Sequence, residues 1–390
     1  MKRYVIIGNG VAGTTAAENI RKHDRDGSIT VLTDEDTPFY YRIRLNEMIS
    51  GDITEKDLIA RKTEWYESEK IGMETNRRAT GADPERKILL AQDGQQLPYD
   101  ILLIATGSHS FVPPIKGADK RGVFTLRSIQ DARDISAWAQ TAEEVVVIGG
   151  GLLGLESGNA LRKLGKKVTV VEFFPRLLPR QLDTDGARRL QGIMEEMGFT
   201  FRLGAKTREI TGEEKASEVR LEGGETLAAD MVVISAGVRP NLELAEPLAL
   251  EKDKGIKVDD HMRTNRPDVF AAGDVAEFKG IPYGIWPAAM EQGKIAGVNM
   301  AGGDLTYSGT TMSTTLKVVG IDLASAGDID AENKFESRVF TDGRTYKKII
   351  IDDKRIVGCI MLGDTKEFSR ITKMMSEERD VSELNKLLHK

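Results

Sequence analysis

The sequence predicts an α/β fold with two Rossmann-like domains and a small C-terminal α+β domain. Two observations predict the Rossmann-like domains: a glycine-rich turn stands between an apolar strand and a helical pattern at Gly8–Gly13, and the same arrangement returns at Gly149–Gly154. The third observation is that residues 304–390 alternate short apolar strands with a final helical run after Asp364. With 390 residues, of which 40% are hydrophobic, the chain can bury two or three cores.

The first glycine turn follows the apolar strand Tyr4–Ile7 and precedes the helical pattern Thr14–Ile20. The turn reads Gly8-Asn9-Gly10-Val11-Ala12-Gly13. We expect the first glycine to allow a sharp bend, the second to let a pyrophosphate approach the backbone, and the third to allow close helix–strand packing. The N-terminus of the helix would then face the negative charge. Ser28–Leu32 is predicted as the next strand.

The second glycine turn repeats this pattern in the middle of the chain. A strand at Val145–Ile148 is followed by Gly149-Gly150-Gly151-Leu152-Leu153-Gly154, by a helix that we expect to start near Leu155, and by a strand at Lys167–Val171. One such turn is weak evidence for a ligand, because glycine-rich turns are common. Two copies in the same strand–turn–helix setting favour dinucleotide binding over structural coincidence.

Acidic residues follow the second strand of each unit, where a carboxylate can accept hydrogen bonds from a ribose. They are Asp34 and Glu35 in the first unit and Glu172 in the second. A carboxylate at Glu172 would bind a free 2′-hydroxyl and repel a 2′-phosphate, which favours NADH over NADPH. Arg176 leaves NADPH open, although a solvated surface arginine is the alternative interpretation.

Three further segments stand in a fixed order with the glycine turns: Leu102–Ser108 lies between the two turns, and Ile234–Asn241 and Phe270–Val275 follow the second. Together with the two turns, they resemble the FAD-dependent pyridine nucleotide-disulfide oxidoreductase superfamily over nearly the whole chain. The resemblance identifies the first segment as the exit from an FAD domain, the second as the return crossing, and the third as a second FAD motif.

The resemblance implies FAD in the first domain, NADH in the second, and the second domain nested inside the first. The implied bounds are 1–111 and 242–303 for the FAD-binding domain, 112–241 for the NADH-binding domain, and 304–390 for the C-terminal α+β domain.

Two of the implied FAD contacts have a structural alternative. The resemblance assigns Asp274 to the ribityl chain, whereas the alternative is a helix cap. It directs the N-terminus of a helix beginning Trp286-Pro287-Ala288 at the pyrimidine edge of the flavin, where the helix dipole would stabilise an anionic reduced ring. The alternative is an ordinary surface helix.

The cofactor-binding residues that we predict from the two turns and the resemblance form one set. They are Gly8, Gly10, Val11, Ala12, Gly13, Asp34, Glu35, Arg42, Ala79, Ala105, Thr106, Gly107, Gly149, Gly151, Leu153, Gly154, Glu172, Gly237, Gly273, Asp274, Pro287 and Ala288.

The segment Phe39–Glu47 indicates the branch of the superfamily, because disulfide reductases carry a cysteine pair there and peroxidase or oxidase relatives carry one cysteine. Here the segment has no sulfur, and the single cysteine of the chain is Cys359. The segment is similar to the rubredoxin reductase and nitrite reductase flavin-domain branch, where a basic residue matching Arg42 contacts FAD.

The resemblance implies that NADH passes a hydride to the flavin and that electrons leave to a small carrier such as rubredoxin. It assigns Glu156 to the nicotinamide–flavin contact, with a position on the helix surface as the alternative. Related reductases pair this glutamate with a lysine, but Glu47 stands at the matching place. We therefore predict Arg44 as the compensating cation, and Glu156 and Arg44 as the catalytic residues.

Two other functions remain open. One is an NADH oxidase or diaphorase, in which oxygen or a small molecule accepts the electrons. The other is a redox-sensing interaction protein that resembles the apoptosis-inducing factor group, in which flavin reduction switches a partner-binding surface.

Composition restricts the partners and the location. The chain has 55 Lys and Arg against 61 Asp and Glu, a formal net charge of -6, and no basic stripe, so nucleic acid is not an expected partner. We expect no metal site, because the four histidines are scattered. No leader or membrane span is evident, so we expect a soluble cytoplasmic protein; a homodimer is left open.

Overall fold

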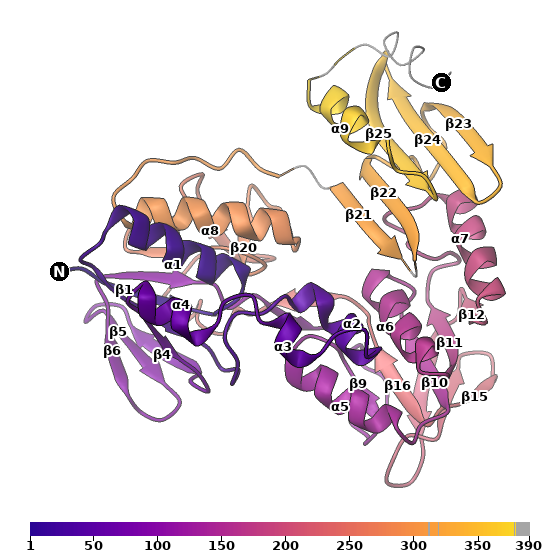
Figure 1. Ribbon diagram of the computed structural model, residues 1–390, viewed down its shortest axis with the longest axis horizontal. Helices are drawn as coiled ribbons and strands as arrows, with labels where there is room; N and C mark the ends of the chain where they lie inside the picture. Colours follow the sequence, from indigo (N-terminus) through magenta and orange to yellow (C-terminus); the bar gives the residue numbers. More distant parts are fainter. Residues whose placement is uncertain (311–312, 319, 378, 380–390) are drawn as a thin grey trace. The chain divides into compact units, whose positions relative to one another are not determined.

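The computed structural model describes residues 1–310, 313–318, 320–377 and 379, so the end of the predicted C-terminal domain, residues 380–390, lies outside the described residues. The chain forms two compact units (Figure 1). The first comprises Met1–Leu45, Ile53–His109 and Val238–Thr310, and the second comprises Asn46–Asp52, Ser110–Gly237 and Thr311–Lys390. The second unit therefore interrupts the first in sequence.

The first unit is built on a five-stranded parallel sheet with the strand order β19-β7-β1-β2-β3. Its strands are β19 (Val269–Ala271), β7 (Ile101–Ile104), β1 (Arg3–Ile7), β2 (Ser28–Leu32) and β3 (Ile71–Glu74). Along β1, Tyr4 and Ile6 face one core and Val5 and Ile7 face a second core. Both faces of the sheet are buried, as expected for parallel strands.

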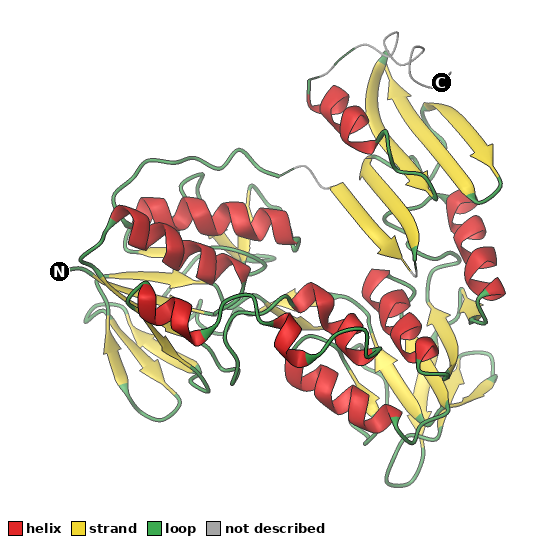
Figure 2. Ribbon diagram, in the orientation of Figure 1, coloured by secondary structure: helices red, strands yellow, loops and turns green. Residues whose placement is uncertain are grey.

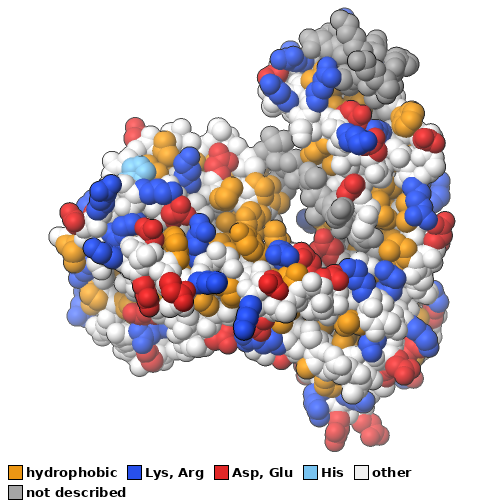
Figure 3. All heavy atoms as spheres, in the orientation of Figure 1, with side chains coloured by type: hydrophobic (Ala, Val, Ile, Leu, Met, Phe, Trp, Pro, Cys, Tyr) orange, Lys and Arg blue, Asp and Glu red, His pale blue; other side chains and the backbone are white. Residues whose placement is uncertain are grey.

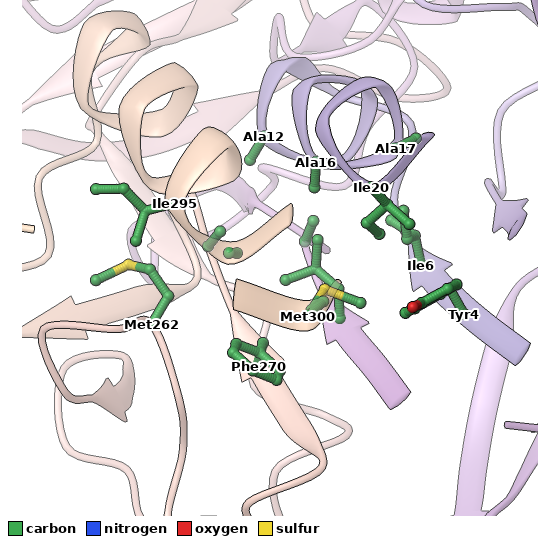
Figure 4. Packing of buried hydrophobic residues seen from close by; sticks show 14 of the residues in the cluster. Tyr4, Ile6, Ala12, Ala16, Ala17, Ile20, Met262, Phe270, Ile295 and Met300 are labelled. Atoms are coloured by element: carbon green, nitrogen blue, oxygen red, sulfur yellow. The ribbon is translucent and has the colours of Figure 1, made fainter. Parts of the chain in front are cut away.

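Two helices, α1 (Val11–His23) and α8 (Trp286–Met300), lie side by side over one face of this sheet (Figures 1 and 4). Their backbones approach closely, because a Cβ at Gly293 would overlap the carbonyl oxygen of Ala12, and one at Gly297 would overlap that of Ala16. Small residues thus lock the helix that follows the first glycine turn to the helix that begins at Trp286.

The remaining elements of the first unit are short. An antiparallel sheet of β4 (Ala79–Asp83), β5 (Ile88–Ala91) and β6 (Gln96–Pro98) supplies Leu89 and Leu97 to the second core. The other helices and strands are η1 (Arg42–Arg44), α3 (Glu55–Leu58), α4 (Thr63–Ser68), β18 (Ile256–Val258) and β20 (Ala276–Phe278). At the crossings between the units, β8 (Ser108–Ser110) pairs with β17 (Val238–Pro240). Helix α2 (Leu45–Ile49) begins in the first unit and ends in the second.

The second unit repeats the parallel design with the strand order β12-β11-β10-β16-β9. The strands are β12 (Thr200–Leu203), β11 (Lys167–Glu172), β10 (Glu144–Ile148), β16 (Met231–Ile234) and β9 (Val123–Phe124). The helices are α5 (Ile129–Ala139), α6 (Leu152–Lys163) and α7 (Thr184–Glu196), and an antiparallel sheet is formed by β13 (Thr207–Thr211), β14 (Glu218–Leu221) and β15 (Thr226–Ala228).

The C-terminal part of the second unit is an antiparallel sheet covered by one helix (Figure 2). Its strand order is β21 (Ser313–Val318), β22 (Ile321–Gly327), β25 (Arg355–Leu362), β24 (Thr345–Asp352) and β23 (Glu336–Asp342), and the helix is α9 (Phe368–Ser376). Phe368, Ile371 and Met374 of α9 pack on apolar residues of the sheet, among them the buried Cys359.

The predicted fold class, with two nested Rossmann-like domains and a C-terminal α+β part, is confirmed. Both helices that follow the glycine turns begin earlier than expected, at Val11 rather than Thr14 and at Leu152 rather than Leu155. The third glycine of each turn lies inside the helix, where its poor helix propensity had favoured a later start.

The predicted domain bounds stay a prediction, and the crossing of residues 46–52 into the second unit was not indicated by any motif. Of the helices in the described residues, not one has the length and apolar character needed to cross a membrane. On the face drawn in Figure 3, acidic and basic side chains are interspersed.

Candidate functional site

The first glycine turn has the backbone geometry that a pyrophosphate requires. Gly8 has a φ of 109°, and a Cβ there would overlap the carbonyl oxygen of Ala105, so the position needs glycine. A Cβ at Gly13 would overlap the carbonyl oxygen of Gly8. A Cβ at Gly10, by contrast, meets nothing within 4 Å, so the backbone there faces open space. The turn is tight on two sides and open on the side where a ligand can approach.

The second glycine turn has the same three properties. A Cβ at Gly149 would overlap the carbonyl oxygen of Ser235, and one at Gly154 would overlap that of Gly149. A Cβ at Gly151 meets nothing within 4 Å. Each unit therefore has one open glycine immediately before its helix, and both turns fit a dinucleotide phosphate.

In the part of the chain that the structure describes, the helices that follow the two turns begin without a side chain that accepts hydrogen bonds from their first N–H groups or places a negative charge beside them. Within the described residues, α1 and α6 have neither a side-chain cap nor an acidic residue in the first turn, whereas Ser128 caps α5 and Asp183 caps α7. An anion placed at either uncapped end would accept hydrogen bonds from these groups and interact favourably with the helix dipole.

The acids after β2 have different surroundings. Asp34 is exposed, whereas the half-buried Glu35 carboxylate accepts hydrogen bonds from the Tyr40 hydroxyl at 2.6 Å and from Arg42 Nη2 at 2.5 Å. Burial lowers the pKa of Arg42, but the charges of Tyr40, Glu35 and Asp274 leave that pKa raised overall. Arg42 thus lies in the electrostatic field of two of the predicted FAD-binding carboxylates, those of Glu35 and Asp274.

Asp274 follows β19 on a turn that is fixed from two sides. Its Oδ2 accepts a hydrogen bond from Ser108 Oγ at 2.8 Å, and the N–H of Gly273 donates to Gln292 Oε1 of α8 at 2.9 Å. Strand β20 follows the turn, so the alternative that Asp274 caps a helix is wrong. Ser108 and Gln292 were not among the predicted site residues, because their partners lie far away in sequence.

Helix α8 carries Pro287 in its first turn, as expected, and Ala288 is buried. Most of the helix is buried, so the alternative of an ordinary surface helix is wrong. At its first residue, Trp286, the centroid of the side-chain ring lies 5.9 Å from that of Phe39 and 6.0 Å from that of Tyr41.

Several predicted residues lie at the connections around these elements. Ala105, Thr106 and Gly107 follow β7, and the backbone carbonyl of Thr106 accepts a hydrogen bond from Asn241 Nδ2 at 2.7 Å. Ala79 is the first residue of β4. In the second unit, Gly237 precedes β17 and Leu153 is exposed on the first turn of α6.

Glu172 is buried at the end of β11 and bonds to its own glycine turn. One carboxylate oxygen accepts the N–H of Gly150 and the other accepts the N–H of Phe174 at 2.8 Å. Each oxygen retains a second lone pair for a ribose hydroxyl. Arg176 donates to the backbone carbonyls of Leu182 and Pro179, at 3.3 and 3.2 Å, so its guanidinium closes the loop instead of extending into solvent.

Glu156 lies on α6 with an amide as its neighbour. Asn46 Nδ2 donates to the carboxylate at 3.4 Å, and Ser157 Oγ donates to Asn46 Oδ1 at 3.0 Å. Burial raises the pKa of Glu156 to about 7; the Asn46 hydrogen bond opposes this increase and the charge of Glu47 adds to it. Glu156 is therefore poised to change protonation near neutral pH.

Arg44 lies in η1 of the first unit, where its charge helps to lower the pKa of Asp57, after the larger effects of hydrogen bonds from Thr54. Glu156 belongs to the second unit, so the predicted pairing with Arg44 stays a prediction. A neighbour within the unit is Asn46, which the sequence did not indicate, although it belongs to the segment Phe39–Glu47 that distinguishes the branches of the superfamily.

One cluster in the described part of the chain brings three possible metal-ligand atoms together. The ligand atoms of Asp259, Asp260 and His261 lie within 4.8 Å of one another. Both ring nitrogens of His261 are already hydrogen-bonded, to Asp260 at 2.7 Å and to Asp304 at 2.8 Å. This self-paired surface cluster gives no reason to assign a metal, and the expected absence of a metal site stays a prediction.

The model of the pyridine nucleotide-disulphide oxidoreductase family matches residues 2–351. A nitrite reductase [NAD(P)H] of Bacillus subtilis is 39% identical over 99% of this chain and 48% of its own length. An NADH-rubredoxin oxidoreductase of Clostridium acetobutylicum is 31% identical over 99% of this chain and 97% of its own length. The chain spans about half the length of the nitrite and nitrate reductase relatives that it matches.

Solved structures show the same similarity. A NAD-dependent persulfide reductase from A. fulgidus has a TM-score of 0.91 at 29% identity, covering 99% of this chain and 79% of that chain. The NADH:rubredoxin oxidoreductase from Clostridium acetobutylicum has a TM-score of 0.86 at 31% identity, covering 99% of this chain and 100% of that chain.

Proposed function

The chain belongs to the pyridine nucleotide-disulphide oxidoreductase family and is a flavoprotein oxidoreductase with FAD and NAD(P)H as its cofactors, and from this premise we propose that it passes electrons from NADH to a small carrier such as rubredoxin. The observation that carries the proposal is the chemistry of Cys359. This thiol is fully buried in β25, and burial raises its pKa to about 12. The only cysteine therefore supplies no thiolate for disulfide or peroxide chemistry.

FAD supplies the redox chemistry, because it accepts a hydride and can return electrons one at a time. In the proposal, Gly10 and the N-terminus of α1 hold its pyrophosphate, Glu35 accepts from its ribose and Asp274 accepts from its ribityl chain. The N-terminus of α8 directs N–H groups at the flavin pyrimidine edge. The uncapped first turn of α1 and the fixed turn at Gly273 support this assignment.

For the second turn we propose NADH, with its pyrophosphate at Gly151 and a ribose hydroxyl on Glu172. The buried carboxylate of Glu172 would repel a 2′-phosphate. Arg176 supports the same choice, because its guanidinium donates to loop carbonyls. We therefore propose NADH over NADPH.

We propose that Glu156 acts where the nicotinamide and the flavin meet. With a pKa of about 7, its carboxyl group can hold or release a proton during turnover at neutral pH. Arg44 stays the proposed counter-charge. Glu47 stands where related reductases have a lysine, and its charge raises the pKa of Glu156. The neutral hydrogen bond from Asn46 favours the ionised carboxyl group less than a cation would.

For the acceptor, the rubredoxin reductase relative supports a small iron protein, since it matches this chain over nearly its whole length. A second candidate acceptor is a nitrite- or nitrate-reducing protein, because this chain matches about half of each such relative. We also propose a cytoplasmic location, and a homodimer stays open.

The test is anaerobic rapid mixing of the FAD-loaded chain with NADH, followed by mixing with oxidised rubredoxin, ferredoxin or flavodoxin. We expect fast flavin reduction and a carrier that is reduced much faster than oxygen. If no carrier is reduced faster than oxygen, an NADH oxidase or diaphorase is the better assignment. Slow reduction with a long-lived charge-transfer complex would instead favour a redox sensor.

A further inference from the structure

The loop 173–183, between β11 and α7, connects the second glycine turn with the C-terminal sheet, and all of these elements belong to the second compact unit. Its first residues follow Glu172, and its last residue is Asp183. The loop therefore joins the carboxylate proposed to bind the NADH ribose to a buried contact with β24.

At its start, the loop is packed against the glycine turn. The carbonyl oxygen of Gly150 accepts the N–H of Leu178 at 3.1 Å, while the N–H of Gly150 donates to Glu172. The contact is tight, since a Cβ at Gly150 would lie 2.9 Å from the Leu177 side chain. Leu177, Leu178 and Glu172 are all buried. A displacement of this part of the loop would therefore move Gly150 and Glu172.

At its end, the loop is held by a buried polar cluster. Asp183 Oδ1 caps α7 by accepting the N–H of Gly186 at 3.0 Å. Its Oδ2 accepts the hydroxyl of Tyr346 at 2.7 Å and lies 3.2 Å from Lys348 Nζ. Burial and the neighbouring Asp183 carboxylate raise the pKa of Tyr346, so the hydroxyl stays protonated and donates.

Lys348 is almost fully enclosed, with a side chain that is 2% exposed. Its ammonium group also donates to the backbone carbonyl of Asp330 at 3.3 Å and to Asn333 Oδ1 at 3.2 Å. The Asp330 carboxylate, itself buried, lies 3.9 Å away. The lysine of β24 thus connects the loop to the segment 330–333, which lies between β22 and β23.

This arrangement is a costly way to join two parts of a protein. Desolvating an ammonium and two carboxylates offsets much of their attraction, and an apolar contact of similar size would stabilise the fold as well or better. Hydrogen bonds between buried charged groups do, however, specify one geometry, because any shift leaves a buried charge without its partner. The cluster is therefore better suited to fixing the position of Asp183 than to adding stability.

We propose that Tyr346 and Lys348 of the C-terminal sheet are positioning residues for nucleotide binding, which fix Asp183 and, through the loop 173–183, the placement of Gly150 and Glu172. This inference rests on the proposed assignment of the second glycine turn to NADH. It gives the C-terminal sheet a role in the affinity of the second unit for its nucleotide, without direct contact between the sheet and the nucleotide.

The test uses the full-length, FAD-loaded chain and ADP-ribose, which carries the ribose and pyrophosphate of NADH without the reactive ring. Tyr346→Phe removes only the hydroxyl that holds Asp183. We expect its dissociation constant for ADP-ribose to rise about three- to tenfold, as for the loss of one buried hydrogen bond. The KM for NADH should rise in parallel, while the rate at saturating NADH changes less than twofold.

Lys347→Met is the matched control. Lys347 precedes Lys348 in β24 and is also largely buried, but it pairs with Asp364 and Glu367 of the C-terminal part, at 2.8 and 2.6 Å. We expect this variant to unfold at a lower temperature and to bind ADP-ribose like the wild type. That contrast would separate positioning of the loop from general loosening of the C-terminal sheet.

Asp183→Asn tests the same pathway from the loop side, because asparagine still caps a helix but has no charge for Lys348. Its effect on ADP-ribose binding should not add to that of Tyr346→Phe. The inference is overturned if Tyr346→Phe and Asp183→Asn bind ADP-ribose as tightly as the wild type, or if Lys347→Met weakens binding equally. A wild-type chain that fails to bind ADP-ribose would instead overturn the assignment of the second turn, and with it this inference.

Discussion

The two glycine turns have the same backbone and different surroundings, and the difference suggests how one fold can hold two cofactors for different purposes. In the first unit, the acid after β2 is held by residues of a later segment, Tyr40 and Arg42. The helix of that turn is locked to α8 by close backbone contacts. In the second unit, Glu172 bonds to its own turn through Gly150.

These surroundings support a resident ligand in the first unit and an exchanging ligand in the second. We propose that FAD is held by several segments that would all have to separate for its release. NADH would be bound by one turn and one loop, so that it can leave in each cycle. The same phosphate-binding backbone would then hold a prosthetic group in one unit and a substrate in the other. The side chains around it would determine whether the ligand stays bound or exchanges.

The largest effect is expected when a side chain is added at Gly10 or at Gly151, one position at a time. Gly10 and Gly151 have extended backbone angles that any residue adopts, and a Cβ at either meets no protein atom within 4 Å. Gly10→Val should therefore fold but bind FAD at least a hundredfold more weakly, because the pyrophosphate loses charged hydrogen bonds to the backbone. FAD content after purification, and the dissociation constant after reconstitution, measure this loss.

Gly151→Val is the matched partner of this substitution. It should stay yellow, with normal FAD content, and lose ADP-ribose binding by a similar factor. The two valines should reduce the stability of their helices by about the same amount, because each replaces an N-cap glycine. If Gly10→Val retained FAD, or if either variant lost both ligands, the assignment of one cofactor to each turn would be wrong.

An intermediate effect is expected at Glu172. Glu172→Gln keeps the size of the side chain and removes its charge, so the KM for NADH should rise about tenfold through loss of a charge-assisted hydrogen bond. The KM for NADPH should rise less than the KM for NADH, or should fall, because the charge no longer repels a 2′-phosphate. Steady-state kinetics with both nucleotides measure the ratio of kcat/KM for NADH to kcat/KM for NADPH. An unchanged ratio would mean that Glu172 does not bind the ribose.

A smaller effect, which depends on pH, is expected at Glu156. The rate of flavin reduction by NADH should change with an inflection near pH 7, and Glu156→Gln should remove that inflection. The folded chain retains this proton as pH rises from about 4.5 to about 7, whereas the unfolded chain releases it. The free energy of unfolding of the wild type should therefore fall relative to that of Glu156→Gln over this range.

Two measurements can contradict this expectation. One is a pH profile of flavin reduction that is identical in the wild type and Glu156→Gln. The other is a difference in stability between the two proteins that does not change from pH 4.5 to pH 7. The first result would mean that protonation of Glu156 does not control flavin reduction, and the second that its carboxyl group does not titrate near neutral pH.

The smallest effects are expected from the neighbours of Glu156, and they should have opposite signs. The hydrogen bond from Asn46 lowers the pKa of Glu156 and the charge of Glu47 raises it. Asn46→Ala should therefore move the inflection above pH 7, and Glu47→Gln should move it below. Shifts in the same direction would show that the substitutions act through a general change of fold instead of through the charge of Glu156.

The parts of the fold that depend on local sequence were predictable. The turns at Gly8 and Gly149 and the strands beside them follow from residues within one short segment. The spacing of each unit also predicts where acids follow its second strand, at Asp34, Glu35 and Glu172, and their role in binding a ribose stays a prediction. Only the starts of α1 and α6 were misplaced, because Gly13 and Gly154 lie inside helices that their propensity disfavours.

The contacts that join distant segments were not predictable. Asn46 meets Glu156 across 110 residues of sequence, and Asp183 meets Tyr346 across 163. No periodicity or turn residue indicates such pairs, since they depend on how complete sheets pack. The sequence predicts Arg44 as the counter-charge of Glu156 by analogy with a missing lysine, and it does not indicate the neutral amide of Asn46 that lies beside this carboxylate.

The most direct test of the central claim is the anaerobic addition of NADH to the purified chain, followed by its absorption spectrum. We expect a yellow protein whose flavin absorbance bleaches on addition of NADH, and bleaches far less with the same amount of NADPH. A protein that stays colourless after incubation with FAD, or a yellow protein that NADH does not bleach, would contradict it.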